Sequence, residues 1–243
     1  LTFLATAGFT AKSVNFTGFA GTWGATSTTT IYGSLTLSTG MTLTASLSAM
    51  TFGATSGNYT ITCNGKTMDF PITFNGIGGT WKMTDTFRVG VTSRAITLTN
   101  GTIDFNSQTL TGTFTFVKAT GTATVQNLTT TVALPITGGT LALGSNVSTG
   151  AFSMTAGTLQ LVTYAYTTTS ITWSGAGTKA FDFGTSGKFI ISSSATATII
   201  TGTATAFTVS GTNPLIESTG GGTGVTKTVN FGALAESQSI GLS

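Results

Sequence analysis

The sequence predicts an all-β fold, a single right-handed parallel β-helix (β-solenoid) with coils of about 18–20 residues. One observation is a repeat: Gly139-Thr-Leu-Ala-Leu143 returns eighteen positions later as Gly157-Thr-Leu-Gln-Leu161. A fixed period of this kind is typical of folds that wind one coil onto the next. A second observation is that apolar residues alternate with small or polar ones within each run, which is the two-residue period of a strand.

Composition is the third observation. Thr and Gly are abundant, Phe, Ile and Val are plentiful, and charged residues make up only 6% of the chain. β-branched and aromatic residues favour strands, whereas the helix formers Glu, Lys, Gln and Arg are scarce. Gly or Asn lies at nearly every break between runs, where a solenoid turns a corner. Tandem antiparallel β-sandwiches are the alternative, because they also contain short strands at regular spacing.

Each expected strand is a short alternating run bounded by turn residues. Pro71 has no N–H for a ladder and therefore marks a strand end. Because such runs recur throughout, we expect one solenoid domain over residues 1–243, and the start at Leu1 suggests a fragment of a longer chain. The runs lie at 34–37, 41–43, 59–62, 101–105, 112–116, 121–125, 139–143, 157–161, 170–173 and 206–209.

Two longer patterns also recur. Phe16-Thr-Gly-Phe-Ala-Gly-Thr-Trp23 returns as Phe74-Asn-Gly-Ile-Gly-Gly-Thr-Trp81, which suggests a super-repeat of about three coils. A five-residue module has the order basic, small, apolar, polar, apolar. Its apolar pair is expected to point inward and its basic and central polar residues outward. The module occurs at 12–16, 66–70, 94–98, 179–183 and 227–231.

The residue inventory excludes several kinds of chemistry. Histidine is absent and Cys63 is the single cysteine, which excludes a Ser-His-Asp triad, His-ligated zinc and a thiolate cluster. The net charge of +3 rests on too few Lys and Arg for a nucleic-acid surface. No apolar run is long enough to cross a bilayer, so no membrane-spanning segment is expected. We also expect no cofactor and no metal.

Two sets of side chains are candidates for a site. Asp69, Asp85 and Asp104 follow one another at intervals close to one coil, so a solenoid could bring these carboxylates onto one face for glycoside hydrolysis. The competing interpretation is structural, because Asp or Asn fills the same slot of several modules. The aromatic set, whose flat rings suit stacking on sugars or filling the core, is Trp23, Trp81, Trp173, Tyr59, Tyr164 and Tyr166.

The Gly-Thr-Leu-x-Leu coils, the Lys-x-Val-Asn-Phe modules and the Phe-x-Gly-x-x-Gly-Thr-Trp pair resemble the degenerate β-solenoid repeats of phage tail and fibre proteins. They are also similar to passenger regions of bacterial surface adhesins. The resemblance implies an extracellular, virion or cell-surface location, contact with cell-surface glycans and, for fibres and tailspikes, a homotrimer. It carries over no site residues.

The first hypothesis is therefore a structural, receptor-binding rod of a phage tail fibre or cell-surface adhesin, in which many weak contacts act together. One alternative is a tailspike-like polysaccharide-degrading enzyme that uses the carboxylates. In that case replacing Asp69 or Asp104 by Ala would abolish cleavage. The other alternative is a self-assembling extracellular filament, because an uncapped solenoid end is an open edge.

Overall fold

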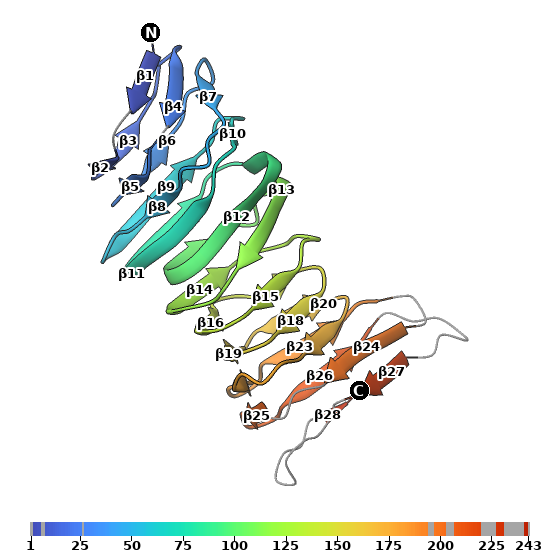
Figure 1. The fold of residues 1–243 in the computed structure, drawn as a ribbon. Helices are drawn as coiled ribbons and strands as arrows, with labels where there is room; N and C mark the ends of the chain where they lie inside the picture. The colour runs from blue at the N-terminus through green and yellow to red at the C-terminus, as the bar shows by residue number, and fades with distance from the viewer. Residues whose placement is uncertain are drawn as a thin grey trace. The chain divides into compact units, whose positions relative to one another are not determined.

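The regular secondary structure in the part of the chain that the structure describes consists of strands, which pair in parallel and are joined by turns and loops. The computed structural model describes residues 2–5, 8–25, 27–193, 197–202, 207–219, 227–230 and 241–242. These residues contain no helix, and hence no helix that could cross a membrane. Successive strands pair in parallel one coil apart, so the predicted β-solenoid is confirmed and antiparallel sandwiches are excluded for these residues (Figure 1).

The structure divides into two compact units, Leu1–Val117 and Lys118–Ser243, which we call unit 1 and unit 2. That one solenoid domain covers the whole chain stays a prediction. The strands of unit 1 are β1 (Thr2–Ala5), β2 (Phe9–Ala11), β3 (Val14–Asn15), β4 (Thr22–Ala25), β5 (Thr29–Ile31), β6 (Leu35–Thr36), β7 (Thr42–Thr44), β8 (Met50–Phe52), β9 (Gly57–Thr62), β10 (Thr67–Met68), β11 (Ile72–Met83), β12 (Phe87–Asp104) and β13 (Leu110–Val117).

Each coil of unit 1 contributes strands to three faces. One face contains β1, β4 and β7, a second contains β2, β5, β8 and the start of β11, and a third contains β3, β6, β9 and the end of β11 (Figure 1). Strand β11 passes from the second face to the third through a register shift at Asn75, where Gly76 and Gly79 allow the backbone to bend against Ala54 and Trp81.

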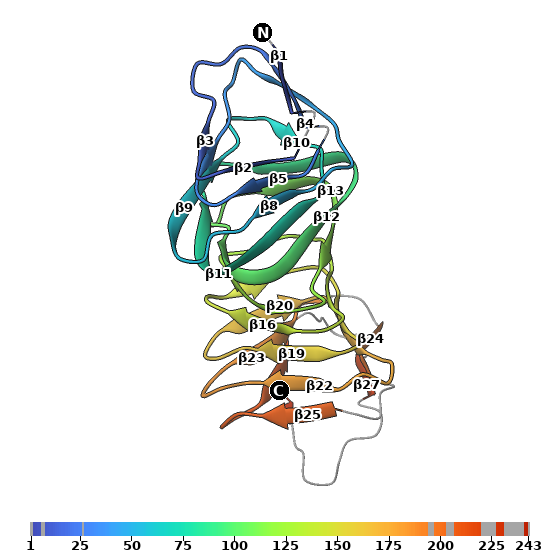
Figure 2. The ribbon, with the colours of Figure 1, turned by 60° about the vertical axis from the view of Figure 1, so that its left-hand side comes forward.

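Unit 2 repeats the three-faced arrangement with its own strands. Figure 2 shows β16, β19, β22 and β25 of one face stacked in order; β15, β18, β21, β24 and β27 form the second face and β17, β20, β23, β26 and β28 the third. The strands are β14 (Thr122–Gln126), β15 (Leu134–Ile136), β16 (Thr140–Leu143), β17 (Val147–Ser148), β18 (Phe152–Met154), β19 (Gly157–Gln160), β20 (Ala165–Thr168), β21 (Ile171–Trp173), β22 (Lys179–Asp182), β23 (Lys188–Ile191), β24 (Ala197–Gly202), β25 (Phe207–Ser210), β26 (Leu215–Ser218), β27 (Lys227–Asn230) and β28 (Gly241–Leu242).

Coil length varies more than the sequence suggests. In unit 2, Thr122 pairs with Thr140, which gives a coil of the expected length, but Ala197 pairs with Lys227 across a much longer coil. In unit 1 the coil that joins Thr2 to Thr22 is shorter than the one that joins Leu35 to Ile61. These strand pairs stay parallel, with one register shift between Thr198 and Ile200, so most of the extra residues lie outside the paired strands.

The core of each unit is a set of apolar columns that run from coil to coil. Ile31, Phe52, Phe74 and Leu98 are register partners in succession, and all four are buried. The Phe52 and Phe74 rings stack with centroids 5.1 Å apart. In a parallel ladder like residues meet face to face, so each buried ring covers the one on the next coil.

Hydroxyl side chains form columns on the outside. Thr10, Thr30, Thr51, Thr73 and Thr97 are successive register partners in unit 1, and none of them is buried. Unit 2 has a shorter column of Thr122, Thr140 and Thr158. The alternation predicted from the sequence therefore separates an apolar interior from a hydroxyl-rich surface.

The predicted super-repeat is wrong as a structural unit. Trp23 lies on β4 in the first face of unit 1, whereas Trp81 lies on β11 in the third face. Each coil between the two tryptophans contains at least as many residues as the coil that joins Thr2 to Thr22. Three such coils need more residues than separate Trp23 from Trp81, so Trp81 comes before the third coil is complete. The matching sequences therefore occupy different faces.

The five-residue module is confirmed for the apolar pairs Met68/Phe70, Ile96/Leu98 and Phe181/Phe183, which are buried. Its outward placement of polar residues is wrong for Asp69, which is buried and pairs with Arg94, and for Lys179, which has no exposed surface. The two-residue period explains the error at Lys179, because the first, third and fifth positions of a strand point to the same side. Lys12 is exposed, as predicted. The copy at 227–231 lies partly outside the described residues.

We predict that Gly112→Ala destabilises the protein far more than Gly65→Ala. Both glycines have positive φ, but a Cβ at Gly112 would overlap the carbonyl oxygen of Val89, whereas a Cβ at Gly65 meets nothing within 4 Å. Backbone strain alone costs about 1–2 kcal/mol, and the clash should raise the loss at Gly112 above about 3 kcal/mol. Urea unfolding measures the loss of unfolding free energy in both variants. Equal losses would contradict the close contact between Gly112 and Val89.

Candidate functional site

The three candidate tryptophans lie in the core. Trp23, Trp81 and Trp173 are at most 1% exposed. Trp81 donates its Nε1–H to the carbonyl oxygen of Gly33 at 3.2 Å, and Trp173 stacks on Phe207 with ring centroids 4.9 Å apart. A ring without exposed surface offers no face to a sugar, so this placement gives the tryptophans a packing role.

The candidate tyrosines differ among themselves. Tyr166 is also buried, and its hydroxyl lies 2.9 Å from that of Thr149. Burial raises the pKa of Tyr166, because the phenolate would lose its hydration. Tyr59 and Tyr164 are half-buried, and the hydroxyl of Tyr59 donates to the carbonyl oxygen of Ser56 at 2.8 Å. The six aromatic residues do not form one platform.

Asp69, the first candidate carboxylate, is part of an ion pair. It lies in the connection between β10 and β11 and is buried. The Nε of Arg94, on β12, lies 2.7 Å from its Oδ1. Removing one partner of a buried ion pair is strongly destabilising, so this pair has a structural role in unit 1.

Asp85, the second candidate, holds the corner of the preceding coil. Its two carboxylate oxygens accept the backbone N–H groups of Cys63 at 2.8 Å and Asn64 at 2.6 Å. Asn64 has a positive φ of 48°, so the carboxylate satisfies the donors of a tightly turned segment. Burial, and then the charge of Asp85, raise the pKa of the Cys63 thiol to about 12. The thiol is therefore a poor nucleophile at neutral pH.

Asp104, the third candidate, closes a local turn. Its Oδ1 accepts the backbone N–H of Asn106, two residues on, at 2.7 Å. The same bond recurs in the module slots of Asn15, which accepts from Thr17, and Asp182, which accepts from Gly184. Asn and Asp both provide this acceptor, which explains why the slot alternates between them.

The three carboxylates therefore have separate tasks within unit 1. Asp69 faces Arg94, Asp85 caps the preceding coil, and Asp104 closes the turn after β12. Within the described ranges, no group of three or more His, Cys, Asp and Glu side chains gathers in the way that a metal ion requires. Catalysis by the carboxylates stays a hypothesis to which this arrangement adds no support.

Two buried lysines were missed by the sequence patterns. Lys118 has no exposed surface, and its Nζ donates to the carbonyl oxygens of Thr120 at 2.6 Å and Gly121 at 3.0 Å. Lys179 donates in the same way to Gly175 at 2.8 Å and to Gly177. Desolvation lowers the pKa of Lys118 to about 8 and also lowers the pKa of Lys179. Each ammonium group satisfies carbonyl groups of a corner inside unit 2.

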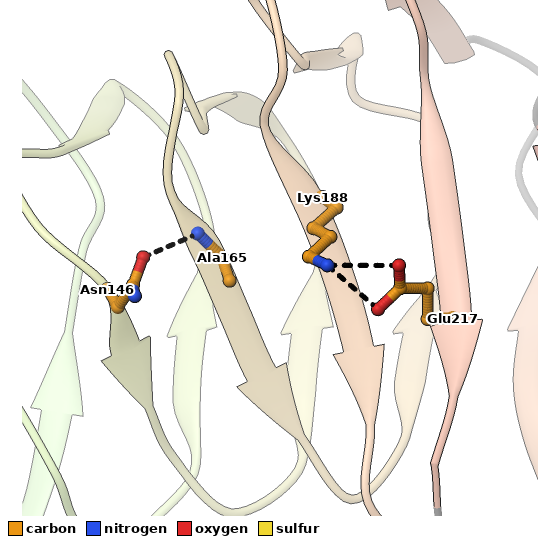
Figure 3. Close-up of polar contacts among 4 residues, drawn as sticks. All are labelled: Asn146, Ala165, Lys188 and Glu217. Atoms are coloured by element: carbon orange, nitrogen blue, oxygen red, sulfur yellow. Dashed lines mark hydrogen bonds and ion pairs between the residues drawn. The ribbon is translucent and has the colours of Figure 1, made fainter.

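Polar contacts also link neighbouring strands on the outside of unit 2. Lys188, on β23, reaches both carboxylate oxygens of Glu217, on β26, at 2.9 and 3.0 Å (Figure 3). Asn146 accepts the backbone N–H of Ala165 through its Oδ1 at 2.9 Å (Figure 3). The ion pair is partly exposed, so we assign it no more than about 1 kcal/mol.

The described surface offers one aromatic ring that the sequence analysis did not single out. Tyr32, which follows β5 in unit 1, is 45% exposed, in contrast to the tryptophans. Its position in the alternation could have identified it, because Tyr32 is two residues after the outward Thr30.

Comparison with protein-family models, with curated proteins and with solved structures gave no match.

We predict that Asp85→Ala destabilises unit 1 by about 2–4 kcal/mol, because two corner N–H groups lose their acceptor. Asp85→Asn keeps one acceptor oxygen and should lose roughly half as much. Urea unfolding followed by tryptophan fluorescence measures both. An unchanged midpoint for Asp85→Ala would show that this carboxylate is not a structural cap.

We also predict that Lys118 makes stability depend on pH between about 8 and 10.5. The unfolded chain keeps this proton up to its ordinary pKa of 10.5, whereas the folded chain releases it at about 8. In this window Lys118 holds its proton more often in the unfolded state, so the contribution of Lys118 to the free energy of unfolding rises with pH. The rise should be on the order of 1–3 kcal/mol.

Comparison with Lys118→Met isolates this effect, since the other groups with shifted pKa values, Cys63, Tyr166 and Lys179, are present in both proteins. The wild-type minus variant difference in unfolding free energy should increase from pH 8 to 10.5 and stay constant below pH 8. A difference that is flat across the whole range would contradict a desolvated Lys118 amine.

Proposed function

We propose that this chain is a structural, receptor-binding part of a virion fibre or cell-surface adhesin. The observation that carries the proposal is the repeated coil, which buries apolar columns and presents hydroxyl and amide side chains to the outside. A repeated surface of neutral polar groups is suited to many weak, equivalent contacts. The site of action is then outside the cell or on the virion.

The chemistry of the outer columns supports glycans as the partner. Thr30, Thr51 and Thr73 offer a methyl group and a hydroxyl group at each coil, and charged residues are only 6% of the chain. Hydroxyl and amide groups exchange hydrogen bonds with sugar hydroxyls without requiring charge on either side. A homotrimer is part of the proposal on the strength of the resemblance to fibres alone.

We expect the purified chain to bind one or more bacterial surfaces or cell-wall polysaccharides weakly as a single copy. Displayed in four copies on streptavidin, it should bind about 10²–10⁴ times more strongly. Because few charges are involved, raising the salt concentration from about 0.1 to about 0.5 M should change binding little. Flow cytometry on intact cells measures both effects, with heat-unfolded protein as the control.

Light scattering after size exclusion tests the homotrimer separately. A stable trimer supports a fibre, and a monomer favours an adhesin-type segment. If four-copy display binds no surface in a broad bacterial panel, the receptor-binding proposal is overturned.

A further inference from the structure

Tyr32 lies in a compact polar patch on the outside of unit 1. Its neighbours along the outer columns are Thr30, two residues earlier on β5, Thr51 on the next coil and Thr73 on the coil after that; the three threonines are register partners. Asn75 and Asn100 continue the column that contains Tyr32 and Gly53. We call this set, Thr30, Tyr32, Thr51, Thr73, Asn75 and Asn100, the Tyr32 patch.

The position of the Tyr32 ring is set by the glycine on the next coil. Gly53 donates its backbone N–H to the carbonyl oxygen of Ile31, so Tyr32 lies beside Gly53. A Cβ built on Gly53 would lie 3.5 Å from Cε1 and 3.8 Å from Cδ1 of Tyr32. One edge of the ring therefore covers the bare backbone of Gly53, while 45% of the residue faces solvent. An aromatic ring held in this way needs little reordering to bind a ligand.

The rest of the patch is polar and neutral. Asn100 donates its Nδ2–H to Oδ1 of Asn75 at 2.8 Å, which forms an amide pair across two coils. The threonines add hydroxyl groups at the coil spacing, about 4.8 Å. No carboxylate belongs to the patch, and its charged neighbour in the column is Lys12, one coil before Tyr32. Neither a cationic ligand nor a purely apolar one matches this chemistry.

We propose that the Tyr32 patch binds a neutral glycan, with a pyranose ring stacked on the exposed face of Tyr32. Sugar hydroxyls then exchange hydrogen bonds with the threonines and with the Asn75–Asn100 amide pair. The C–H face of a neutral sugar packs on an aromatic ring, and its hydroxyl rim needs neutral donors and acceptors. This inference rests on the proposed receptor-binding function and names its ligand class and its site.

The test is affinity electrophoresis of the full chain in gels that contain dextran, galactomannan or xyloglucan. Binding to a printed array of neutral oligosaccharides is measured in parallel. Tyr32→Ala should weaken binding to the recognised glycan roughly tenfold or more, and Tyr32→Phe should keep most of it because the ring remains. Leu47→Ala is the matched control, since Leu47 is an 85% exposed apolar residue outside the patch. Circular dichroism and thermal melting establish that each variant folds.

Three outcomes are decisive. Binding that falls with Tyr32→Ala but not with Leu47→Ala supports the site. If Tyr32→Ala leaves glycan binding unchanged, the proposed site is wrong, whereas the observed glycan binding still supports the receptor-binding proposal. Failure to bind any neutral glycan also overturns the site, and the cell-surface experiment then decides the receptor-binding proposal by itself.

Discussion

The parallel hydrogen-bond register between successive coils is the constraint on which the rest of the structure depends. It places each inward side chain on its counterpart one coil away, as in the column of Ile31, Phe52 and Phe74. The same register sets the outward threonines in line. The backbone ladder fixes both surfaces at once, so a shift in the register of one strand would displace its inward and its outward side chains together.

At the corners the backbone leaves the ladder, and side chains there supply hydrogen-bond partners for backbone groups. Asp85 accepts two corner N–H groups, and Lys118 donates to two corner carbonyl groups. Such charged groups are retained in low-polarity surroundings because the backbone groups they satisfy are costly to leave unpaired. Several of the few charges in the chain are thus used to hold its backbone.

Much of the fold follows from the sequence, whereas the roles of single side chains do not. The two-residue period around Leu141 and Leu159 predicts the strands and their buried faces, which the structure confirms. The same period could have predicted the burial of Lys179, because residues two and four positions apart on a strand, here Lys179, Phe181 and Phe183, point to the same side. The partners of Asp69 and Asp85 could not be predicted, because coils of unequal length place their residues at different corners. The outward direction of Tyr32 follows from the alternation, but its contact with Gly53 in the next coil has no local sequence signal.

The coils of unit 2 lengthen between the one that joins Thr122 to Thr140 and the one that joins Ala197 to Lys227, and this has an evolutionary consequence. Strand pairing continues while the connecting segments lengthen, with one register shift between Thr198 and Ile200, so the solenoid accepts inserted residues at the cost of a local irregularity in the ladder. Selection on what the corners contact is then largely separated from selection on foldability. A chain of this kind can diversify its surface one coil at a time, and the record of the original repeat fades from its sequence while its backbone keeps the periodicity.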